Sequence, residues 1–296
     1  MTADDRWPTI RYAPVGDLTL AYETFGNPAD PTILLVMGLG AQMLGWPDEL
    51  CESLAASGHH VIRFYNRDIG LSTHLDHLPA PSTPDLLLRR STPYRLTDMA
   101  NDTFGLLDHL GIEQVHLVGT SMGGFISQTM ALRSPERIRT LSLSMTSTGS
   151  RRVGQPTAAV LRRLARQNPP ASRQAAMDDT AATYRIIGSP GHGDEDKMRE
   201  LAGISWDRSS NPNGRLRQLA AIMAQSDRTA ALRTLRIPTV VVHGLSDPLV
   251  AASGGLALAK AISGATFVGY HGMGHDLPHS RWGDLSASIV GLIDRA

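Results

Sequence analysis

The stretch Val115-His116-Leu117-Val118-Gly119-Thr120-Ser121-Met122-Gly123 joins an apolar run to the start of a predicted helix. Its last five residues have the pattern G-x-S-x-G, in which a serine occupies a tight turn between a strand and a helix. Side chains at the two outer positions would collide with the neighbouring strand and helix, so glycine is needed there. Such a turn raises the Ser121 hydroxyl to the top of a sheet, where a base can reach it. The stretch therefore predicts a nucleophilic serine on an α/β sheet.

Strand-like and helix-like segments alternate on both sides of this stretch. Residues 18–25 alternate between apolar and polar side chains, as in a half-buried strand, and predict an early hairpin. Continuous apolar runs predict further strands, and apolar side chains at helical spacing predict the helices between them. The predicted strands are 32–37, 60–65, 115–118, 138–145, 239–243 and 266–270, and the predicted helices are 49–57, 97–110, 122–134 and 282–293. This order predicts an α/β fold with a mostly parallel central sheet and helices on both faces.

Strand-like runs disappear in the long segment that precedes the strand at 239–243. Helical stretches such as 160–166 and 214–225 alternate there with Pro and Gly breaks. Residues 151–217 contain 12 Lys and Arg against 7 Asp and Glu. The segment is either a lid whose excess charge could favour an anionic group, or a set of surface helices with solvated arginines. We divide the chain into a core first part (1–146), a helical cap (147–235) and a core second part (236–296).

The nucleophile has candidate partners later in the chain. A serine hydroxyl is a poor nucleophile, so it needs a base, and the base needs an acid that orients it. Asp247 follows the apolar strand 239–243, and His275 lies in the glycine-flanked loop 272–276 after the last predicted strand. This order along the chain is the one expected after a G-x-S-x-G turn. Because the carboxyl ends of parallel strands meet at one edge of a sheet, Ser121, Asp247 and His275 are predicted to meet there.

Each partner also has a simpler structural interpretation. Asp247 precedes a proline and could be only a turn or helix-capping residue. His271, His275 and His279 share a spacing of four, which on a helix would indicate a metal-binding face. The glycines and the proline among them argue against a helix, so we predict no metal site and take His275 as the base. His243, within a strand, is predicted to be a core histidine with its hydrogen bonds satisfied.

An acyl-transfer site also needs two backbone N–H donors for the oxygen that becomes negative. One belongs to the residue after the nucleophile, here Met122, at the start of its helix. The other should come from the loop after the early buried strand, and we assign it to Leu39 within the segment Met37-Gly38-Leu39-Gly40. The simpler interpretation of that glycine pair is a plain flexible turn.

Composition and charge narrow the class of protein. The 296 residues are enough for one large α/β domain with an insertion. The formal net charge is zero, which gives no electrostatic reason to expect a nucleic-acid partner. The first residues lack the pattern of a secretory signal, and no apolar run approaches the roughly 20 residues that span a bilayer. The single cysteine, Cys51, fits a reducing compartment, so we expect a cytoplasmic protein in which Cys51 is a buried residue of a helix.

Together these segments resemble the α/β-hydrolase superfamily over almost the whole chain. The similar segments are the oxyanion segment 36–40, the motif Tyr65-Asn66-Arg67-Asp68-Ile69-Gly70-Leu71-Ser72, the serine turn, and the loops of Asp247 and His275. More narrowly, residues 35–38 and 45–49 resemble actinobacterial esterases of the aclacinomycin methylesterase type and mycobacterial enzymes known as lipases or carboxylesterases.

Two positions depart from the superfamily pattern. Met37 stands where a histidine is usual, which removes a side-chain role but leaves the backbone donor at Leu39. The sequence Asn66-Arg67-Asp68-Ile69 stands where D-x-R-G is usual, so the hydrogen bonds of that turn are expected to be rearranged.

The resemblance implies a serine hydrolase of carboxylic esters, lipid-like or methyl esters, that forms an acyl-enzyme on Ser121 and needs no cofactor. It leaves open thioester or phospholipid deacylation, C–C bond hydrolysis, perhydrolysis and aminopeptidase chemistry on the same residues. A binding protein that keeps the fold without the chemistry is the alternative from another class. The expected partner is a small acyl ester or lipid. Candidate apolar pocket residues, each equally explained as ordinary core, are Met43, Leu44, Trp46, Met122, Met145, Trp206 and Met223.

Overall fold

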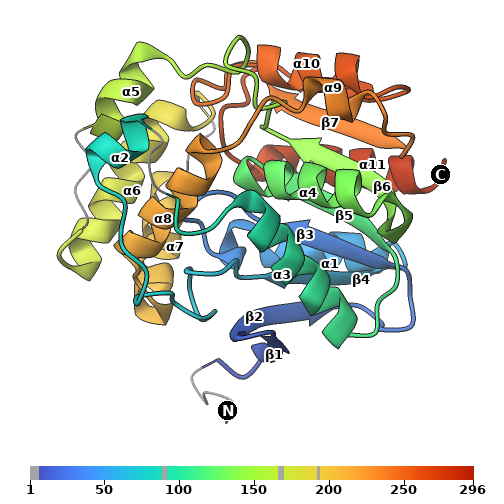
Figure 1. The fold of residues 1–296 in the computed structure, drawn as a ribbon, viewed down its shortest axis with the longest axis horizontal. Coiled ribbons are helices and arrows are strands. Elements are labelled where there is room, and N and C mark those ends of the chain that lie inside the picture. Colours follow the sequence, from blue (N-terminus) through green and yellow to red (C-terminus); the bar gives the residue numbers. More distant parts are fainter. Residues whose placement is uncertain (1–6, 89–91, 166–169, 192–193) are drawn as a thin grey trace.

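Eight strands form one open sheet in the parts of the chain that the computed structural model describes, residues 7–88, 92–165, 170–191 and 194–296 (Figure 1). The strands are β1 (Arg11–Val15), β2 (Leu18–Phe25), β3 (Thr32–Val36), β4 (His60–Phe64), β5 (Val115–Thr120), β6 (Ile138–Ser144), β7 (Thr239–Gly244) and β8 (Thr266–Tyr270). Their order across the sheet is β1-β2-β4-β3-β5-β6-β7-β8. β1 and β2 form the expected antiparallel hairpin at one edge, and β3 to β8 run parallel to one another. The predicted mostly parallel sheet is confirmed.

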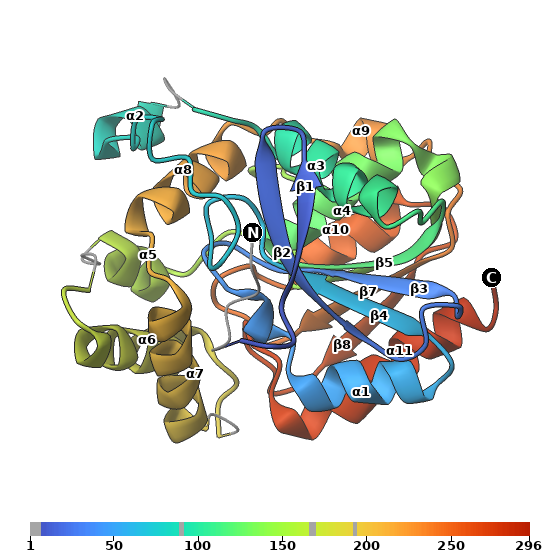
Figure 2. The same ribbon diagram turned by 90° about the horizontal axis from the view of Figure 1, so that it is seen from below.

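Helices cover both faces of the sheet (Figure 2). One face carries α1 (Asp48–Ala56) and α11 (Trp282–Ile293), and the other carries α3 (Leu96–His109), α4 (Met122–Arg133), α9 (Thr229–Leu232) and α10 (Ser253–Ala261). Successive strand residues point to opposite faces, so Ile33 and Leu35 pack in the cluster with α1 and α11, whereas Leu34 and Val36 pack in the cluster with α3 and α4. Both clusters are buried, which explains why the central strands are apolar throughout. Three short 3₁₀ turns lie at Met43–Gly45, Pro135–Arg137 and His279–Arg281.

The remaining helices form a separate layer beyond the carboxyl ends of the parallel strands (Figures 1 and 2). They are α2 (Thr83–Leu88), α5 (Ala158–Ala165), α6 (Arg173–Ile187), α7 (Glu195–Arg208) and α8 (Pro212–Met223). We call α5 to α8 the cap. Short α9 and Leu235 fall within the predicted cap range 147–235, but they pack with α10 and the core cluster.

A buried ion pair joins the cap to the core. Arg217 of α8 donates from Nε to one oxygen of Asp68 at 2.9 Å and from Nη2 to the other at 2.8 Å. Both side chains are almost inaccessible, with 1% and 0% of their surface exposed. Burial alone raises the pKa of Asp68, but hydrogen bonds from Arg217 and from the Leu75 N–H outweigh it and leave the pKa below its usual value. The cap is thus docked on the core by a charged pair that water does not reach.

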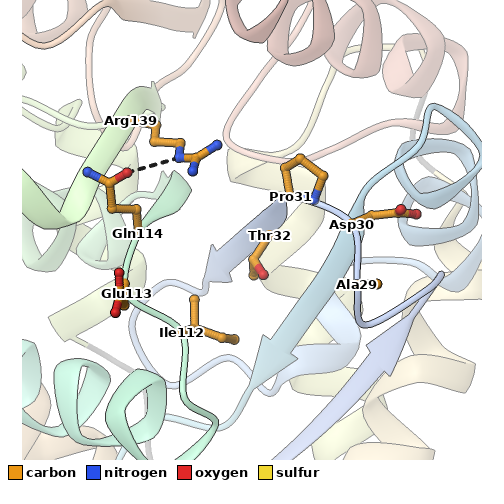
Figure 3. A pocket seen from close by; sticks show the side chains of 8 residues that line it. All are labelled: Ala29, Asp30, Pro31, Thr32, Ile112, Glu113, Gln114 and Arg139. Carbon is orange, nitrogen blue, oxygen red and sulfur yellow. Dashed lines mark hydrogen bonds between the residues drawn. The ribbon is translucent and has the colours of Figure 1, made fainter.

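A hollow of about 320 Å³ opens at the amino ends of the parallel strands (Figure 3). Its wall includes a hydrogen bond from Arg139 to the side-chain oxygen of Gln114, at 3.2 Å. It is lined by Ala29, Asp30, Pro31, Thr32, Ile112, Glu113, Gln114 and Arg139. Because Ser121 follows the carboxyl end of β5, this hollow and the serine lie at opposite edges of the sheet.

Cys51 is buried in α1, as expected, in the cluster between α1 and α11. Burial raises the pKa of its thiol to about 12. Within the described residues, no helix combines the length and the apolar character needed to cross a bilayer.

Candidate active site

Ser121 occupies a strained turn between β5 and α4. Its backbone has φ 53° and ψ −117°, a conformation that residues with a side chain rarely adopt. A Cβ added to Gly119 would lie 2.3 Å from the Ser127 Oγ, and one added to Gly123 would lie 2.0 Å from the Val36 carbonyl oxygen. Both distances are too short for any side chain, so the two outer glycines of the motif are required by packing.

The three predicted residues meet at the carboxyl edge of the sheet. The Ser121 Oγ lies 3.1 Å from His275 Nε2, and His275 Nδ1 lies 2.7 Å from an oxygen of Asp247. With the ring proton on Nδ1, the imidazole donates to Asp247 and its Nε2 accepts from the serine hydroxyl. The arrangement can therefore move the serine proton to the imidazole while the carboxylate stabilises the charge that forms.

Asp247 also makes hydrogen bonds within its own turn, which is the simpler structural role considered for it from the sequence. Its other oxygen, Oδ1, accepts from the backbone N–H groups of Leu249 and Val250, at 2.9 and 2.8 Å. These bonds fix the carboxylate, which is 6% exposed, and leave Oδ2 for His275. The turn role and the role as partner of the base thus use different oxygens of one side chain.

His243 lies beneath this acid loop. It is fully buried, and its Nε2 lies 2.7 Å from the Val250 carbonyl and 3.6 Å from Asp247 Oδ2. Burial lowers the pKa of His243, which favours a neutral ring that donates from Nε2 to Val250. The expectation of a fully satisfied core histidine is wrong in one respect, because its buried Nδ1 has no partner among the described residues.

The loop after β3 passes directly beside the serine. A Cβ on Gly38 would lie 3.2 Å from the Ser121 Cβ and 3.7 Å from its Oγ. The Ala41 N–H donates to the Gly38 carbonyl at 3.4 Å, and Gly40 has φ +65°, so residues 38–41 form a turn. We name residues 38–41 the oxyanion turn. The geometry is compatible with an N–H donor at Leu39, whose role as a donor, like that of Met122, stays a prediction.

Residues 66–68, which follow β4 and depart from the superfamily motif, each make specific contacts. The Asn66 side-chain amide donates to the Met37 carbonyl at 3.1 Å, and so holds the start of the oxyanion turn. Arg67 forms a two-point bond with Asp102 of α3, at 2.5 and 2.6 Å. Asp68, the third residue, pairs with the cap. The expected rearrangement of this turn is therefore a set of bonds to the oxyanion turn, to α3 and to α8.

The end of α6 in the cap contacts the loop of the base. The His275 N–H donates to the Ile187 carbonyl at 2.6 Å, and the Gly274 N–H donates to the Ser189 Oγ at 2.9 Å. The Ser189 hydroxyl in turn donates to Asp276 at 2.5 Å. The cap therefore holds two successive backbone N–H groups, at Gly274 and His275, and the side chain of the residue that follows the histidine.

The candidate pocket residues fall into two groups. Met43 and Trp46 are fully buried in hydrophobic clusters of the core, and Met122 and Met145 are 1% and 3% exposed. The others are half-buried: Leu44 after β3, Trp206 on α7 and Met223 at the end of α8. The role of both groups as pocket lining stays a prediction.

Two residues of the site region were not predicted from the sequence. Ser189 and Gln218 both hydrogen-bond loops of the site, yet in the sequence they are ordinary polar residues of a polar cap. No motif or spacing marks them. Asn66 did carry a signal, because it stands at a departure from a family motif.

The three histidines considered for a metal site, His271, His275 and His279, do not form a metal-binding cluster. His271 is exposed, and His279 packs edge-on against the Trp282 ring at 4.6 Å. In residues 7–88, 92–165, 170–191 and 194–296, no three His, Cys, Asp or Glu side chains form a group that could hold a metal ion.

Known proteins resemble this chain along most of its length. It matches the family described as alpha/beta hydrolase fold over residues 31–280. It is 28% identical to "Rhodomycin D methylesterase DauP" from Streptomyces sp. (strain C5), with 92% of this chain and 94% of that protein covered. It is 27% identical to "3-oxoadipate enol-lactonase 2" from Acinetobacter baylyi, with 84% of each chain covered.

Among solved structures, the enol-lactonase from Burkholderia xenovorans LB400 superposes with a TM-score of 0.74 at 24% identity, covering 96% of this chain and 100% of that one. A hydrolase from Pseudomonas aeruginosa PA01 superposes with a TM-score of 0.71 at 24% identity, covering 98% and 100%. At these identities the structures show the shared fold. Because the family match spans most of the chain, this protein belongs to the alpha/beta hydrolase fold family.

Proposed function

We propose that this protein hydrolyses carboxylic esters, with Ser121 as the nucleophile, His275 as the base and Asp247 as the acid that orients it. The observation that carries the proposal is the continuous hydrogen-bonded chain from the Ser121 Oγ through the His275 ring to Asp247. Ser121 is 154 positions from His275 in sequence, and His275 is 28 from Asp247, yet the three side chains share one geometry that suits proton transfer.

The first half-reaction forms an acyl-enzyme. The Ser121 Oγ attacks the ester carbonyl carbon while its proton moves to His275 Nε2. The carbonyl oxygen becomes negative and accepts hydrogen bonds from the N–H groups of Leu39 and Met122. When the C–O bond to the alcohol breaks, the leaving oxygen takes the proton from His275. Asp247 stays ionised throughout and stabilises the imidazolium.

Water completes the cycle. His275 takes a proton from a water molecule, and the water oxygen attacks the acyl carbon. Collapse of this second tetrahedral intermediate returns the proton to the Ser121 Oγ and releases a carboxylic acid. The cycle needs no redox or cofactor step.

The relatives support a hydrolase that acts on ester bonds, since they carry the names methylesterase and enol-lactonase. The two methylesterases align with 92% of this chain, including the cap. We therefore take small methyl esters as the first substrate class to test.

Ion pairs leave most of the basic excess of the cap in place, so a phospholipid and a coenzyme A thioester belong in the substrate panel. In four of five ion pairs that hold arginines of residues 151–217, the acid belongs to the same segment, and in the fifth the acid is Asp68, which lies outside it. The five pairs are Arg163 with Asp179, Arg173 with Asp207, Arg185 with Glu195, Arg199 with Asp178, and Arg217 with Asp68.

A substrate panel with matched variants tests the proposal. Methyl esters and p-nitrophenyl esters of several chain lengths are compared with an acyl-CoA thioester and a phospholipid. Wild type and His271→Gln, whose imidazole is exposed in the same loop, should hydrolyse the esters. Ser121→Ala and His275→Gln should lose about 10³-fold or more in kcat. The proposal fails if wild type hydrolyses none of the carboxylic esters, or if folded Ser121→Ala keeps the wild-type rate.

A further inference from the structure

Gln218 of α8 connects the cap to the oxyanion turn. Its side chain is fully buried. Its Oε1 accepts from the Gly40 N–H at 2.9 Å, and its Nε2 donates to the Arg67 carbonyl at 2.9 Å. Both ends of the amide are therefore used, and both partners are backbone groups of the core. A buried side chain held at both ends has one orientation.

The bond to Gly40 fixes the one peptide unit of the turn that can flip. In the turn of residues 38–41, Leu39 and Gly40 are the central residues, and Gly40 has φ +65° while Leu39 is not among the residues with positive φ. This combination is a type II turn. Type I and type II turns differ by a rotation of the central peptide, here the Leu39–Gly40 unit. A Gly40 N–H held by Gln218 keeps the turn in type II.

That peptide directly follows the predicted oxyanion donor. The Leu39 N–H belongs to the preceding peptide, Gly38–Leu39, which lies between the Met37 carbonyl and the Gly40 N–H, so its position depends on how firmly those two groups are held. On the other side, Asn66 holds the Met37 carbonyl at 3.1 Å. The turn is thus held by the core before Gly38 and by the cap at Gly40, next to the Ser121 side chain.

We infer that Gln218 is a positioning residue: through Gly40 it keeps the Leu39 N–H aimed at the oxygen that becomes negative in the transition state. The inference rests on the proposed esterase function. Oxyanion donors act only where their N–H groups point at the developing charge, so a turn that shifts after losing its anchor at Gly40 loses transition-state binding and keeps substrate binding. The cap therefore contributes to catalysis itself, in addition to any control of access.

Gln42 offers a matched control. It is also a buried glutamine that joins core and cap with two hydrogen bonds, from Nε2 to the Ser205 and Ser209 carbonyls at 2.7 and 2.9 Å. Neither bond involves the oxyanion turn. Gln42→Met and Gln218→Met therefore remove similar docking bonds with similar loss of polarity, and differ in whether the Gly40 N–H loses its acceptor.

The test compares the two variants in ester hydrolysis and in binding of two inhibitors. A trifluoromethyl ketone forms a hemiketal oxyanion with the nucleophile, whereas an unreactive amide of the same shape resembles the ground state. Gln218→Met should lower kcat by roughly 10- to 100-fold and weaken ketone binding by the same factor, with KM and amide binding changed by less than about threefold. Gln42→Met should keep kcat and ketone affinity within about threefold of wild type. Gln218→Asn, which is too short to reach both partners, gives the same readouts if Gln218→Met does not fold.

Three outcomes are distinguishable. If Gln218→Met loses no more kcat than Gln42→Met, or if it loses ketone and amide affinity equally, the positioning role is wrong. If wild type neither hydrolyses esters nor forms the ketone adduct, the proposed function fails first. A selective loss of kcat and ketone affinity in Gln218→Met supports the inference.

Discussion

Asp247 uses its two carboxylate oxygens for two different purposes. One oxygen accepts two backbone N–H bonds of its own loop, and the other faces His275. Asp247→Asn should keep most of the loop bonds, because an amide oxygen can still accept them, but it cannot hold the imidazole in the required tautomer. We expect kcat to fall by about 10³- to 10⁴-fold with little change in thermal midpoint. Steady-state kinetics with a thermal melt measures both, and a fall of less than tenfold would contradict the assignment of Asp247.

The reactivity of the Cys51 thiol gives a second, independent prediction at the residue scale. Its thiol is completely buried, and burial raises its pKa to about 12, so thiolate is scarce at neutral pH. The folded protein should resist alkylation by iodoacetamide and react stoichiometrically after denaturation. Rapid labelling of the native protein, detected by mass, would show that α1 opens far more often than this packing implies.

Single residues were predictable where a motif constrains the backbone. Ser121 sits in a turn that tolerates only glycine at positions 119 and 123, and its partners follow strands whose ends share one edge. Gln218 and Ser189 were not predictable, because their function depends on which loop the folded cap brings within 3 Å of them. No local pattern in a polar helix encodes that contact.

At the scale of elements, the segment that follows α6 contacts the loop of His275 through Ser189. Ser189→Ala removes the acceptor of the Gly274 N–H and the donor to Asp276. We expect kcat to fall by about tenfold through a less well-fixed His275, with a modest loss of stability of about 1 kcal/mol. Ser189→Thr, which keeps the hydroxyl, should recover most of the rate.

A control for that prediction lies far from the site. The Ser53 Oγ is 3.2 Å from the Ser286 Oγ, between α1 and α11. Ser53→Ala removes a hydroxyl bond between elements and should leave kcat unchanged. Equal losses of kcat in Ser189→Ala and Ser53→Ala would contradict a specific role for the segment that follows α6.

The elements differ in how readily the sequence predicts them. Buried parallel strands are apolar on both faces, so runs such as those of β3 and β7 stand out. α10 begins with Ser253-Gly254-Gly255, residues that disfavour helix, and it was not predicted. It forms because close packing requires the glycines: a Cβ on Gly255 would lie 2.4 Å from His243 Nδ1. Tertiary contacts therefore determine whether α10 forms, and a short stretch of sequence does not reveal them.

For the whole molecule, docking of the cap depends on the buried pair of Arg217 and Asp68. Arg217→Met leaves the Asp68 carboxylate buried without its cation and should cost about 3–5 kcal/mol of unfolding free energy in urea. The double variant Asp68→Asn/Arg217→Met removes both charges and keeps a residue suited to the φ of 69° at position 68, so it should recover part of that loss. If the double variant is as unstable as the sum of the two single variants, the pair is not coupled.

The unfolding free energy should decrease at acidic pH, because several buried histidines are neutral in the folded protein. Burial, with the charges of His59 and Arg139, lowers the pKa of His116 to about 4, and burial also lowers those of His60 and His243. In the unfolded chain these rings take up a proton near pH 6.5, so between about pH 6.5 and 4 the unfolded state binds more protons. The unfolding free energy should therefore fall as pH falls through this window, with His116 contributing on the order of 2 to 3 kcal/mol. Urea titrations across this pH window should show that the unfolding free energy falls less steeply in His116→Gln than in wild type. A variant of the exposed His77 serves as the control, and its unfolding free energy should fall as steeply as that of wild type.

The central claim is that the Ser121 Oγ, activated by His275, carries the acyl group during ester hydrolysis. The most direct test is peptide mass spectrometry of the protein after reaction with a fluorophosphonate, together with acid-quenched turnover of an activated ester. The account predicts one adduct per chain, on the peptide that contains Ser121, and a labelling rate that falls by about 10³-fold in His275→Gln. An adduct on any other residue, or undiminished ester turnover by folded protein whose Ser121 carries the phosphonyl adduct, would contradict it.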